Sequence, residues 1–179
     1  MRQLKKEEHF PKIFTEITMD SEHIIMMPYY EGKKIKFDES IWFVKNYVKA
    51  LLLSIKKLNN MGYVHGDIKP DNFIYNNPEN YYLIDFNSSD MKNKENNNIK
   101  IATFPYIPPE KNKYSDLYKD ISNVKSDLWS LGIILLQFIS KNRNIFLKNG
   151  KTVKKVHYFN ILNYMVQTKV KLKNIKKYN

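Results

Sequence analysis

The sequence contains no cysteine in its 179 residues. Without cysteine the chain can form neither a disulfide framework nor a zinc or iron–sulfur site with cysteine ligands. The longest apolar stretch, around residues 131–136, is far shorter than the roughly 20 residues that cross a bilayer. The first ten residues are charged and lack the apolar segment of a signal peptide. We therefore expect an intracellular protein without a membrane span, located in the cytoplasm or alternatively in the nucleus.

The sequence also contains fewer acidic than basic residues. Asp and Glu number 18 against 30 Lys and Arg, which gives a net charge of +12, and only two of the 30 cations are Arg. Lys, Asn and Ile, which are all abundant, have A/T-rich codons, so we expect the charge to reflect in part an AT-rich genome, with which a viral or parasite source is compatible. A nucleic-acid-binding function would depend on the net charge and the Lys-rich tail alone, without interleaved Arg or a groove-reading motif. We therefore expect no nucleic-acid partner.

Short apolar runs predict β-structure in two places. Residues 9–17 and 23–30 read as strands joined by a turn at Asp20-Ser21. Residues 73–76 and 81–85 flank the turn-forming sequence Asn-Pro-Glu-Asn and read as a hairpin. The sequence therefore predicts at least two antiparallel pairs of short strands.

Helical periodicity is clearest over residues 38–62, where apolar residues recur in steps of three and four. Asp38 or Ser40 can cap the start of this helix. Residues 127–139 are apolar on every side, which predicts a helix in the middle of a core, and residues 153–168 are weakly amphipathic. The remaining stretches read as a mobile loop at 88–100 and a basic tail at 169–179.

Four short strings carry the chemistry of the sequence. They are HGDIKPDN (65–72), LIDFN (83–87), TFPYIPPE (103–110) and SDLWSLG (126–132). In order and spacing they resemble the catalytic loop, metal-binding loop, substrate loop and core helix of the eukaryotic protein kinase family, of the Ser/Thr type. The string HGDIKPDNF also occurs in the Bub-type checkpoint kinases, and HGDIK in the vaccinia-related kinases. The resemblance covers roughly residues 9–140.

This resemblance implies transfer of the γ-phosphate of ATP to Ser or Thr of a protein substrate, with ATP and Mg²⁺ as cofactors. Such transfer needs an in-line nucleophile, a proton acceptor and cations that gather the phosphate charge. Asp67 would accept the proton of the substrate hydroxyl, and Lys69 would neutralise the migrating phosphate. Asn72 and Asp85 offer the hard oxygen ligands that suit Mg²⁺. Thr103 in the substrate loop resembles the Ser/Thr-specific members.

The same resemblance places the nucleotide pocket and several structural residues. Adenine would bind along the hinge at the end of the strand 23–30. The residues implied in nucleotide binding are Met27, Tyr29, Tyr30 and Ile74. The residues implied in structural roles are His65, Phe86, Glu110 and Asp127, of which His65 packs in the core and Asp127 holds the catalytic-loop backbone from below.

The expected fold is therefore α+β and protein-kinase-like, with a mainly α-helical C-lobe and a remnant of the N-lobe sheet and hinge. We expect remnant N-lobe strands and the hinge in residues 1–35. Residues 36–140 would form the C-lobe with the catalytic and activation segments. Residues 141–179 would form a shortened C-terminal helical region and the basic tail.

The sequence also departs from the family pattern. No Gly-x-Gly-x-x-Gly string and no Val-Ala-Ile-Lys strand lysine occur in the 179 residues, and Gly66 stands where the family usually has an arginine that reads loop phosphorylation. These departures leave a second interpretation open. In it the chain is a pseudokinase, a binding module that inhibits or docks onto another kinase. The expected partner is accordingly either a protein substrate or a partner kinase.

Overall fold

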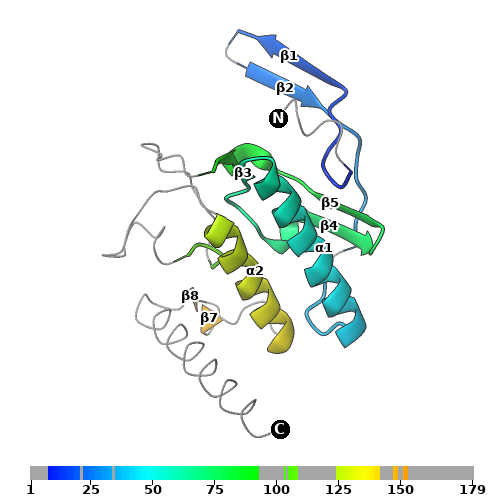
Figure 1. Cartoon of the computed structure of the whole chain (residues 1–179), viewed down its shortest axis with the longest axis vertical. Helices are drawn as coiled ribbons and strands as arrows, with labels where there is room; N and C mark the ends of the chain where they lie inside the picture. Colours follow the sequence, from blue (N-terminus) through cyan, green and yellow to red (C-terminus); the bar gives the residue numbers. More distant parts are fainter. Residues whose placement is uncertain are drawn as a thin grey trace, which may run out of the picture. The chain divides into compact units, whose positions relative to one another are not determined.

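The computed structural model describes residues 8–20, 22–33, 35–92, 103, 105–108, 124–141, 147–148 and 151–152. The chain divides into two compact units, Met1–Asn142 and Arg143–Asn179. In the second unit the described residues form one antiparallel hairpin of β7 (Leu147–Lys148) and β8 (Lys151–Thr152). Every other described element belongs to the first unit (Figure 1). The helix expected at 153–168, the tail at 169–179 and Glu110 lie outside the described residues.

The first element is an antiparallel hairpin of β1 (Thr15–Met19) and β2 (Glu22–Met26), in which Ile17 pairs with Ile24. All ten strand residues are exposed, and the hairpin projects from the rest of its unit (Figure 1). The strand predicted at 9–17 was wrong in its first half, and the strand predicted at 23–30 ends earlier than expected.

Each of the two shifts in the strand bounds has an identifiable cause. His9 adopts a left-handed backbone conformation with φ 69°, which a continuous strand does not allow. Its carbonyl accepts a hydrogen bond from the Leu83 N–H at 3.0 Å instead. At the other end Pro28 lacks an N–H, so the ladder stops at Met26.

The long helix α1 (Ile41–Asn60) confirms the helix predicted over 38–62. Ser40 caps its start, where the side-chain oxygen accepts a hydrogen bond from the Phe43 N–H at 3.2 Å. Past its end Gly62 has φ 85°, a conformation that glycine adopts without strain. The buried face consists of Tyr47, Ala50, Leu51, Ser54, Ile55 and Leu58.

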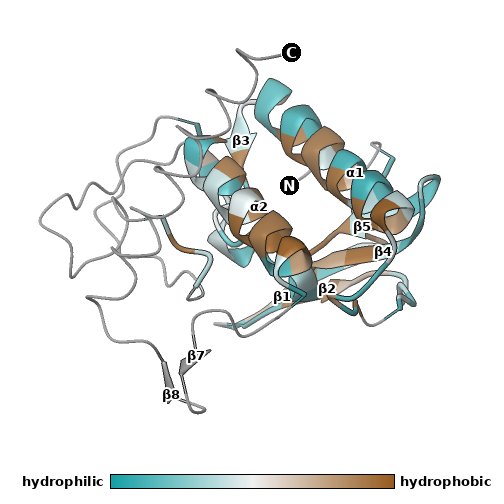
Figure 2. Ribbon diagram, turned by 90° about the horizontal axis from the view of Figure 1, so that it is seen from below, coloured by the Kyte–Doolittle hydropathy of each residue, from teal (hydrophilic) through white to brown (hydrophobic). Residues whose placement is uncertain are grey.

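Helix α1 packs against the hairpin of β4 (Phe73–Asn77) and β5 (Asn80–Leu83), which confirms the second predicted strand pair, and against α2 (Val124–Ile139). Figure 2 shows the two helices side by side, with β4 and β5 below α1. An aromatic cluster fills the junction, with the Tyr47 ring 5.1–5.4 Å from the rings of Phe73, Tyr75 and Phe138. This core carries the loops that follow α1 and β5. None of the described helices is both long and apolar enough to span a membrane.

Helix α2 differs from the all-round apolar core helix that its sequence predicts. Its apolar residues Leu128 and Ile139 are 42% and 71% exposed, whereas Asp127, Ser130 and Gln137 are buried. The buried polar groups serve the neighbouring loops: Ser130 Oγ donates to the Tyr106 carbonyl at 2.8 Å, and Gln137 Oε1 accepts from the Tyr106 hydroxyl at 3.3 Å. The helix therefore supports loop backbone as well as the apolar core.

The turn after β5 is more ordered than the loop predicted at 88–100. A 3₁₀ turn, η3, covers Phe86–Ser88, and β6 (Asp90–Met91) then pairs with β3 (Tyr63–Val64). The prediction was therefore wrong for its first residues, and residues 93–100 lie outside the described part of the chain. Backbone pairing across β3 and β6 compensates for the missing side-chain periodicity, and it brings η3 against the segment that follows β3.

Candidate active site

The loop after β3 is held from below by a buried carboxylate. Asp127 on α2 is 2% exposed, and its two oxygens accept hydrogen bonds from the His65 N–H at 2.8 Å and the Gly66 N–H at 2.9 Å. Charge-assisted hydrogen bonds of this kind are stronger than neutral ones. A helix from late in the sequence thus fixes the backbone immediately before Asp67.

His65 is fully buried and links this loop to the residue before Asp85. Its Nε2–H donates to the Ile84 carbonyl at 3.0 Å, and its Nδ1 accepts from the Asp67 N–H at 3.3 Å. These two partners define the tautomer. Burial lowers the pKa of His65 and favours the neutral ring, although nearby Asp127 acts in the opposite direction. The Phe86 ring packs 5.0 Å from the imidazole, so His65 and Phe86 form one packed unit.

Asp67 stands at the centre of a hydrogen-bond network and is 8% exposed. Its Oδ2 accepts from Lys69 Nζ at 2.6 Å and from Asn72 Nδ2 at 3.1 Å, and its Oδ1 accepts from the Thr103 N–H at 3.2 Å. Lys69 also donates to Thr103 Oγ1 at 2.9 Å. Four residues predicted to act together therefore do lie in contact.

The network keeps the Asp67 carboxylate charged. Burial acts to raise its pKa, but the hydrogen bonds from Lys69 and Thr103, together with the Lys69 charge, outweigh burial and hold that pKa below the ordinary value of 3.8. A carboxylate in this state can accept a hydrogen bond from a hydroxyl donor. The Lys69 ammonium beside it supplies a positive charge at the same point.

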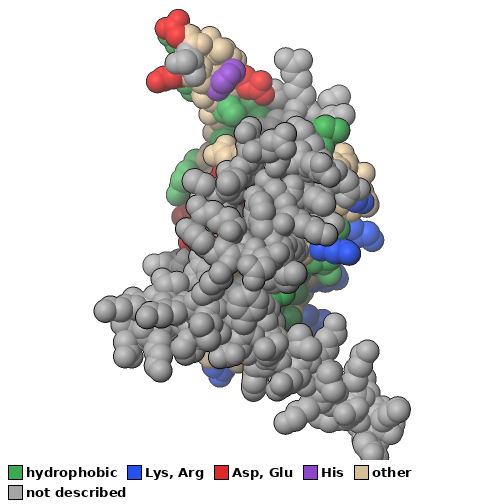
Figure 3. Space-filling view, turned by 90° about the vertical axis from the view of Figure 1, so that its left-hand side faces the viewer, with side chains coloured by type: hydrophobic (Ala, Val, Ile, Leu, Met, Phe, Trp, Pro, Cys, Tyr) green, Lys and Arg blue, Asp and Glu red, His purple; other side chains and the backbone are tan. Residues whose placement is uncertain are grey.

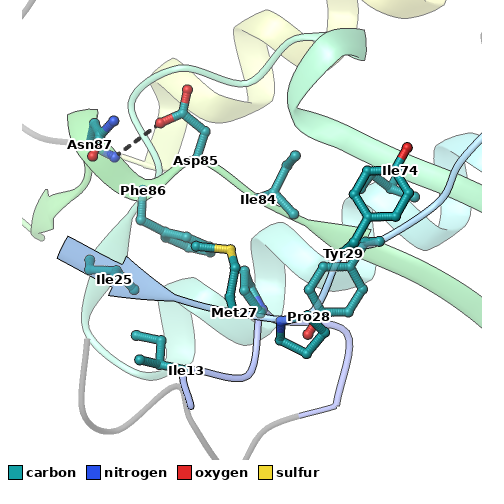
Figure 4. Close-up of a pocket in the computed structure, with 12 residues that line it drawn as sticks. Ile13, Ile25, Met27, Pro28, Tyr29, Ile74, Ile84, Asp85, Phe86 and Asn87 are labelled. Carbon is teal, nitrogen blue, oxygen red and sulfur yellow. Dashed lines mark hydrogen bonds between the residues drawn. The ribbon is translucent and has the colours of Figure 1, made fainter. Parts of the chain in front are cut away.

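Asn72 and Asp85 lie on adjoining segments, since the Ile84 N–H donates to the Asn72 carbonyl at 3.0 Å. Asn72 Nδ2 donates to two acceptors on Asp67, the carbonyl at 2.9 Å and Oδ2, so the amide oxygen is left for another ligand. Asp85 is exposed in a left-handed conformation with φ 61°, and its Oδ1 accepts from the Asn87 N–H at 3.4 Å (Figure 4). One carboxylate and one amide oxygen fit Mg²⁺ that is also held by phosphates and water. Within the described residues no three His, Asp or Glu side chains gather into an all-protein metal site.

A cavity of about 560 Å³ lies between the β1–β2 hairpin and the segment 84–87. This volume falls in the range of sites that enclose small ligands. Figure 4 shows Met27 beside Phe86, with Ile84 and Asp85 on the same side of the cavity. All four residues predicted to bind nucleotide line it: Met27, Tyr29, Tyr30 and Ile74. Its wall is mainly apolar, and Asp85 brings a carboxylate to it.

Sequence reasoning missed two features of the site. Pro11, Ile84 and Asn87 also line the cavity, and the position of Ile84 directly before Asp85 was the available signal. The second feature is the close approach of Gly66 to the turn η3. Gly66 has φ 83°, and a Cβ placed on it would lie 2.5 Å from the Ser88 carbonyl oxygen. No local sequence pattern predicts the contact between Gly66 and Ser88.

Comparison with known proteins identifies the family of this chain. The model of the protein kinase domain matches residues 3–178. Serine/threonine-protein kinase Genghis Khan of Drosophila melanogaster is 27% identical over an alignment of 162 residues that covers 79% of this chain and 10% of that protein. Serine/threonine-protein kinase VHS1 of Saccharomyces cerevisiae is 33% identical over an alignment of 134 residues that covers 65% of this chain and 29% of that protein. The matched region thus spans less than a third of each relative. The chain belongs to the protein kinase family.

Proposed function

We propose that this chain transfers the γ-phosphate of ATP to Ser or Thr hydroxyls of protein substrates. The observation that carries the proposal is the network around Asp67, in which a charged carboxylate, the Lys69 ammonium and Thr103 meet within 3.2 Å. Catalysis of this transfer consists mainly of positioning and of charge stabilisation. The names of the related Ser/Thr kinases support the choice of acceptor.

The proposed reaction forms a bond between the substrate hydroxyl oxygen and the γ-phosphorus and breaks the bond from that phosphorus to ADP. Asp67 orients the hydroxyl and takes its proton. Lys69, which already lies 2.6 Å from Asp67, stabilises the charge on the migrating phosphoryl group. Asn72 and Asp85 would hold Mg²⁺, which would supply positive charge to the phosphate groups. Thr103 positions both Asp67 and Lys69.

In this proposal the 560 Å³ cavity receives the adenine. Met27 and Ile74 contact the base, and the backbone of residues 28–30 is the hinge. The hairpin β1–β2 corresponds to the N-lobe remnant in residues 1–35, and α1, α2 and the loops between them correspond to the C-lobe in residues 36–140. Residues 141–179 then form the C-terminal region.

The hairpin also supports the alternative function of a pseudokinase that docks onto another kinase. Two strands are only marginally stable as an independent sheet. In this hairpin the apolar side chains of Ile17, Ile24 and Met19 are also 41%, 44% and 61% exposed. Residues 13–32 contain four acidic residues and no Lys or Arg. Figure 3 shows acidic and apolar side chains together at the top of the view, where this hairpin lies. Exposed apolar surface of this kind marks interaction sites. We therefore propose that another protein, a partner kinase, covers the hairpin.

Nucleotide binding tests the part of the proposal that both functions share. In a thermal-shift titration of the chain, ATP should raise the melting temperature in the presence of Mg²⁺, and EDTA should remove most of that shift. The reason is that Asp85 is the only acidic residue among those lining the cavity and repels the phosphates unless a cation lies between them. Micromolar ATP affinity that EDTA leaves unchanged would contradict the proposed role of Asn72 and Asp85.

A further inference from the structure

A second cavity, of about 270 Å³, lies beside the C-terminal half of α1, where it is bordered by β5. His9, Leu53, Lys56, Lys57, Asn60 and Tyr81 are among the residues that line it. None of the residues proposed above for phosphate transfer or nucleotide binding does so. Its volume is below the roughly 300–1,000 Å³ of sites that enclose a small-molecule ligand. The size therefore suits a single side chain of a larger partner.

One wall of this cavity is a fixed aromatic pair. The rings of His9 and Tyr81 stack at 3.8 Å with an interplanar angle of 8°. His9 Nδ1 lies 3.1 Å from the Tyr81 carbonyl, to which it donates, and the backbone bond from Leu83 to His9 fixes the same residue. Opposing groups come from α1, where Leu53 is 45% exposed. An apolar side chain entering here would therefore meet preformed surface.

The helix that borders the cavity is strongly basic. Helix α1 contains four lysines and no Asp or Glu. Lys56 is exposed at the cavity, and Lys57 is held beside it by a hydrogen bond to the Glu8 carbonyl at 3.3 Å and by its position 5.9 Å from the Phe10 ring centroid. Burial raises the pKa of Tyr81, and the charge of Glu8 raises it further, so among the described residues Glu8 is an acid near the cavity. Among the described residues the two lysines outnumber this acid, so the cavity has a positive rim. Phe10, Leu53 and the Tyr81 ring give it apolar lining, beside the polar Ser54 and Asn60.

We propose that this cavity is a docking site for an acidic segment of a protein partner. One apolar side chain of that segment occupies the cavity against Leu53 and the His9–Tyr81 pair, and its carboxylates lie beside Lys56 and Lys57. Charge complementarity selects an acidic partner and makes association salt-sensitive. The cavity is separate from the Asp67 network, so binding of a partner here does not depend on phosphate transfer.

Fluorescence anisotropy with synthetic peptides tests the proposal on the full chain. The probe is a fluorescein-labelled 12-residue peptide with one leucine flanked by Asp and Glu. One control peptide replaces the leucine by serine, and a second replaces every acid by lysine. The acidic leucine peptide should bind, the serine peptide about tenfold more weakly, and the lysine peptide not at all.

Matched protein variants locate the binding. Lys56→Glu should weaken the acidic leucine peptide about tenfold or more, because it reverses a charge at the cavity. Lys45→Glu, an equal charge change at another exposed position of α1, should weaken it less than about threefold. Leu53→Ser should remove the advantage of leucine over serine. Equal losses for Lys56→Glu and Lys45→Glu, or equal binding of the leucine and serine peptides, would overturn the proposal in favour of diffuse attraction. Failure of the acidic peptide to bind would overturn it outright.

Discussion

Replacing Gly66 by alanine should destabilise the protein more than the same replacement at Gly62. The two glycines have nearly the same backbone conformation, with φ 83° and 85°, in a region that costs an L-residue about 1–2 kcal/mol. They differ in surroundings. A Cβ on Gly66 would lie 2.5 Å from the Ser88 carbonyl oxygen, whereas at Gly62 no described atom lies within 4 Å. Backbone that must move to relieve such overpacking costs about 1–3 kcal/mol more.

The expected loss in the free energy of unfolding is therefore about 1–2 kcal/mol for Gly62→Ala and about 2–5 kcal/mol for Gly66→Ala. Urea unfolding followed by circular dichroism measures both, and an unchanged m-value would show that the two variants unfold from comparable native states. Equal losses would refute the reasoning, because they would mean that the Gly66–Ser88 contact carries no energy and that the loop before Asp67 is not braced against η3.

Three further changes test the network around Asp67. Lys69→Ala should lower kcat about 10²–10³-fold in steady-state kinetics while changing ATP affinity much less, because the ammonium acts mainly on the migrating phosphate; a loss confined to ATP affinity would contradict this. Asp127→Asn should lower unfolding stability by about 2–3 kcal/mol in calorimetry, because one acceptor of the His65 and Gly66 N–H groups becomes a donor; an unchanged melting temperature would contradict it. Since the folded-state pKa of Asp67 lies below 3.8, its ionised form contributes stability fully above that pH. The stability difference between wild type and Asp67→Asn should therefore shrink as pH falls through the lower, folded-state pKa. Denaturant unfolding at a series of acidic pH values measures this difference, and a difference that stays constant would contradict the prediction.

Local patterns were sufficient for the elements that depend on local interactions. Helix α1 was predictable from its apolar spacing and from Ser40, and the β4–β5 hairpin from the turn at residues 77–80. The bounds of β1 depend instead on the long-range bond between His9 and Leu83, which no short window contains. The polar buried face of α2 also depends on long-range contacts, since the Asp127 carboxylate accepts hydrogen bonds from backbone N–H groups 61–62 residues away in the sequence.

The site shows the same division between local and long-range information. The order of the four motifs indicated which residues would meet, and Asp67, Lys69, Asn72 and Thr103 do lie in contact. The cavity could be predicted only in part, because Pro11 and Asn87 reach it through chain packing. The basic cavity beside α1 has no motif at all. Its residues come from three separate segments, and only the structure brings them together.

Transfer of radiolabelled phosphate from ATP to casein by the purified chain, with Mg²⁺ present, tests the central claim most directly. The wild-type chain should label Ser or Thr, and Asp67→Asn should reduce the rate by about 10²-fold or more, because the change keeps the side-chain shape and removes the proton acceptor. Asp38→Asn, which alters an exposed acid outside the site, serves as the matched control and should leave the rate unchanged. Labelling that survives Asp67→Asn, or a folded wild-type chain that transfers no phosphate, would contradict the account.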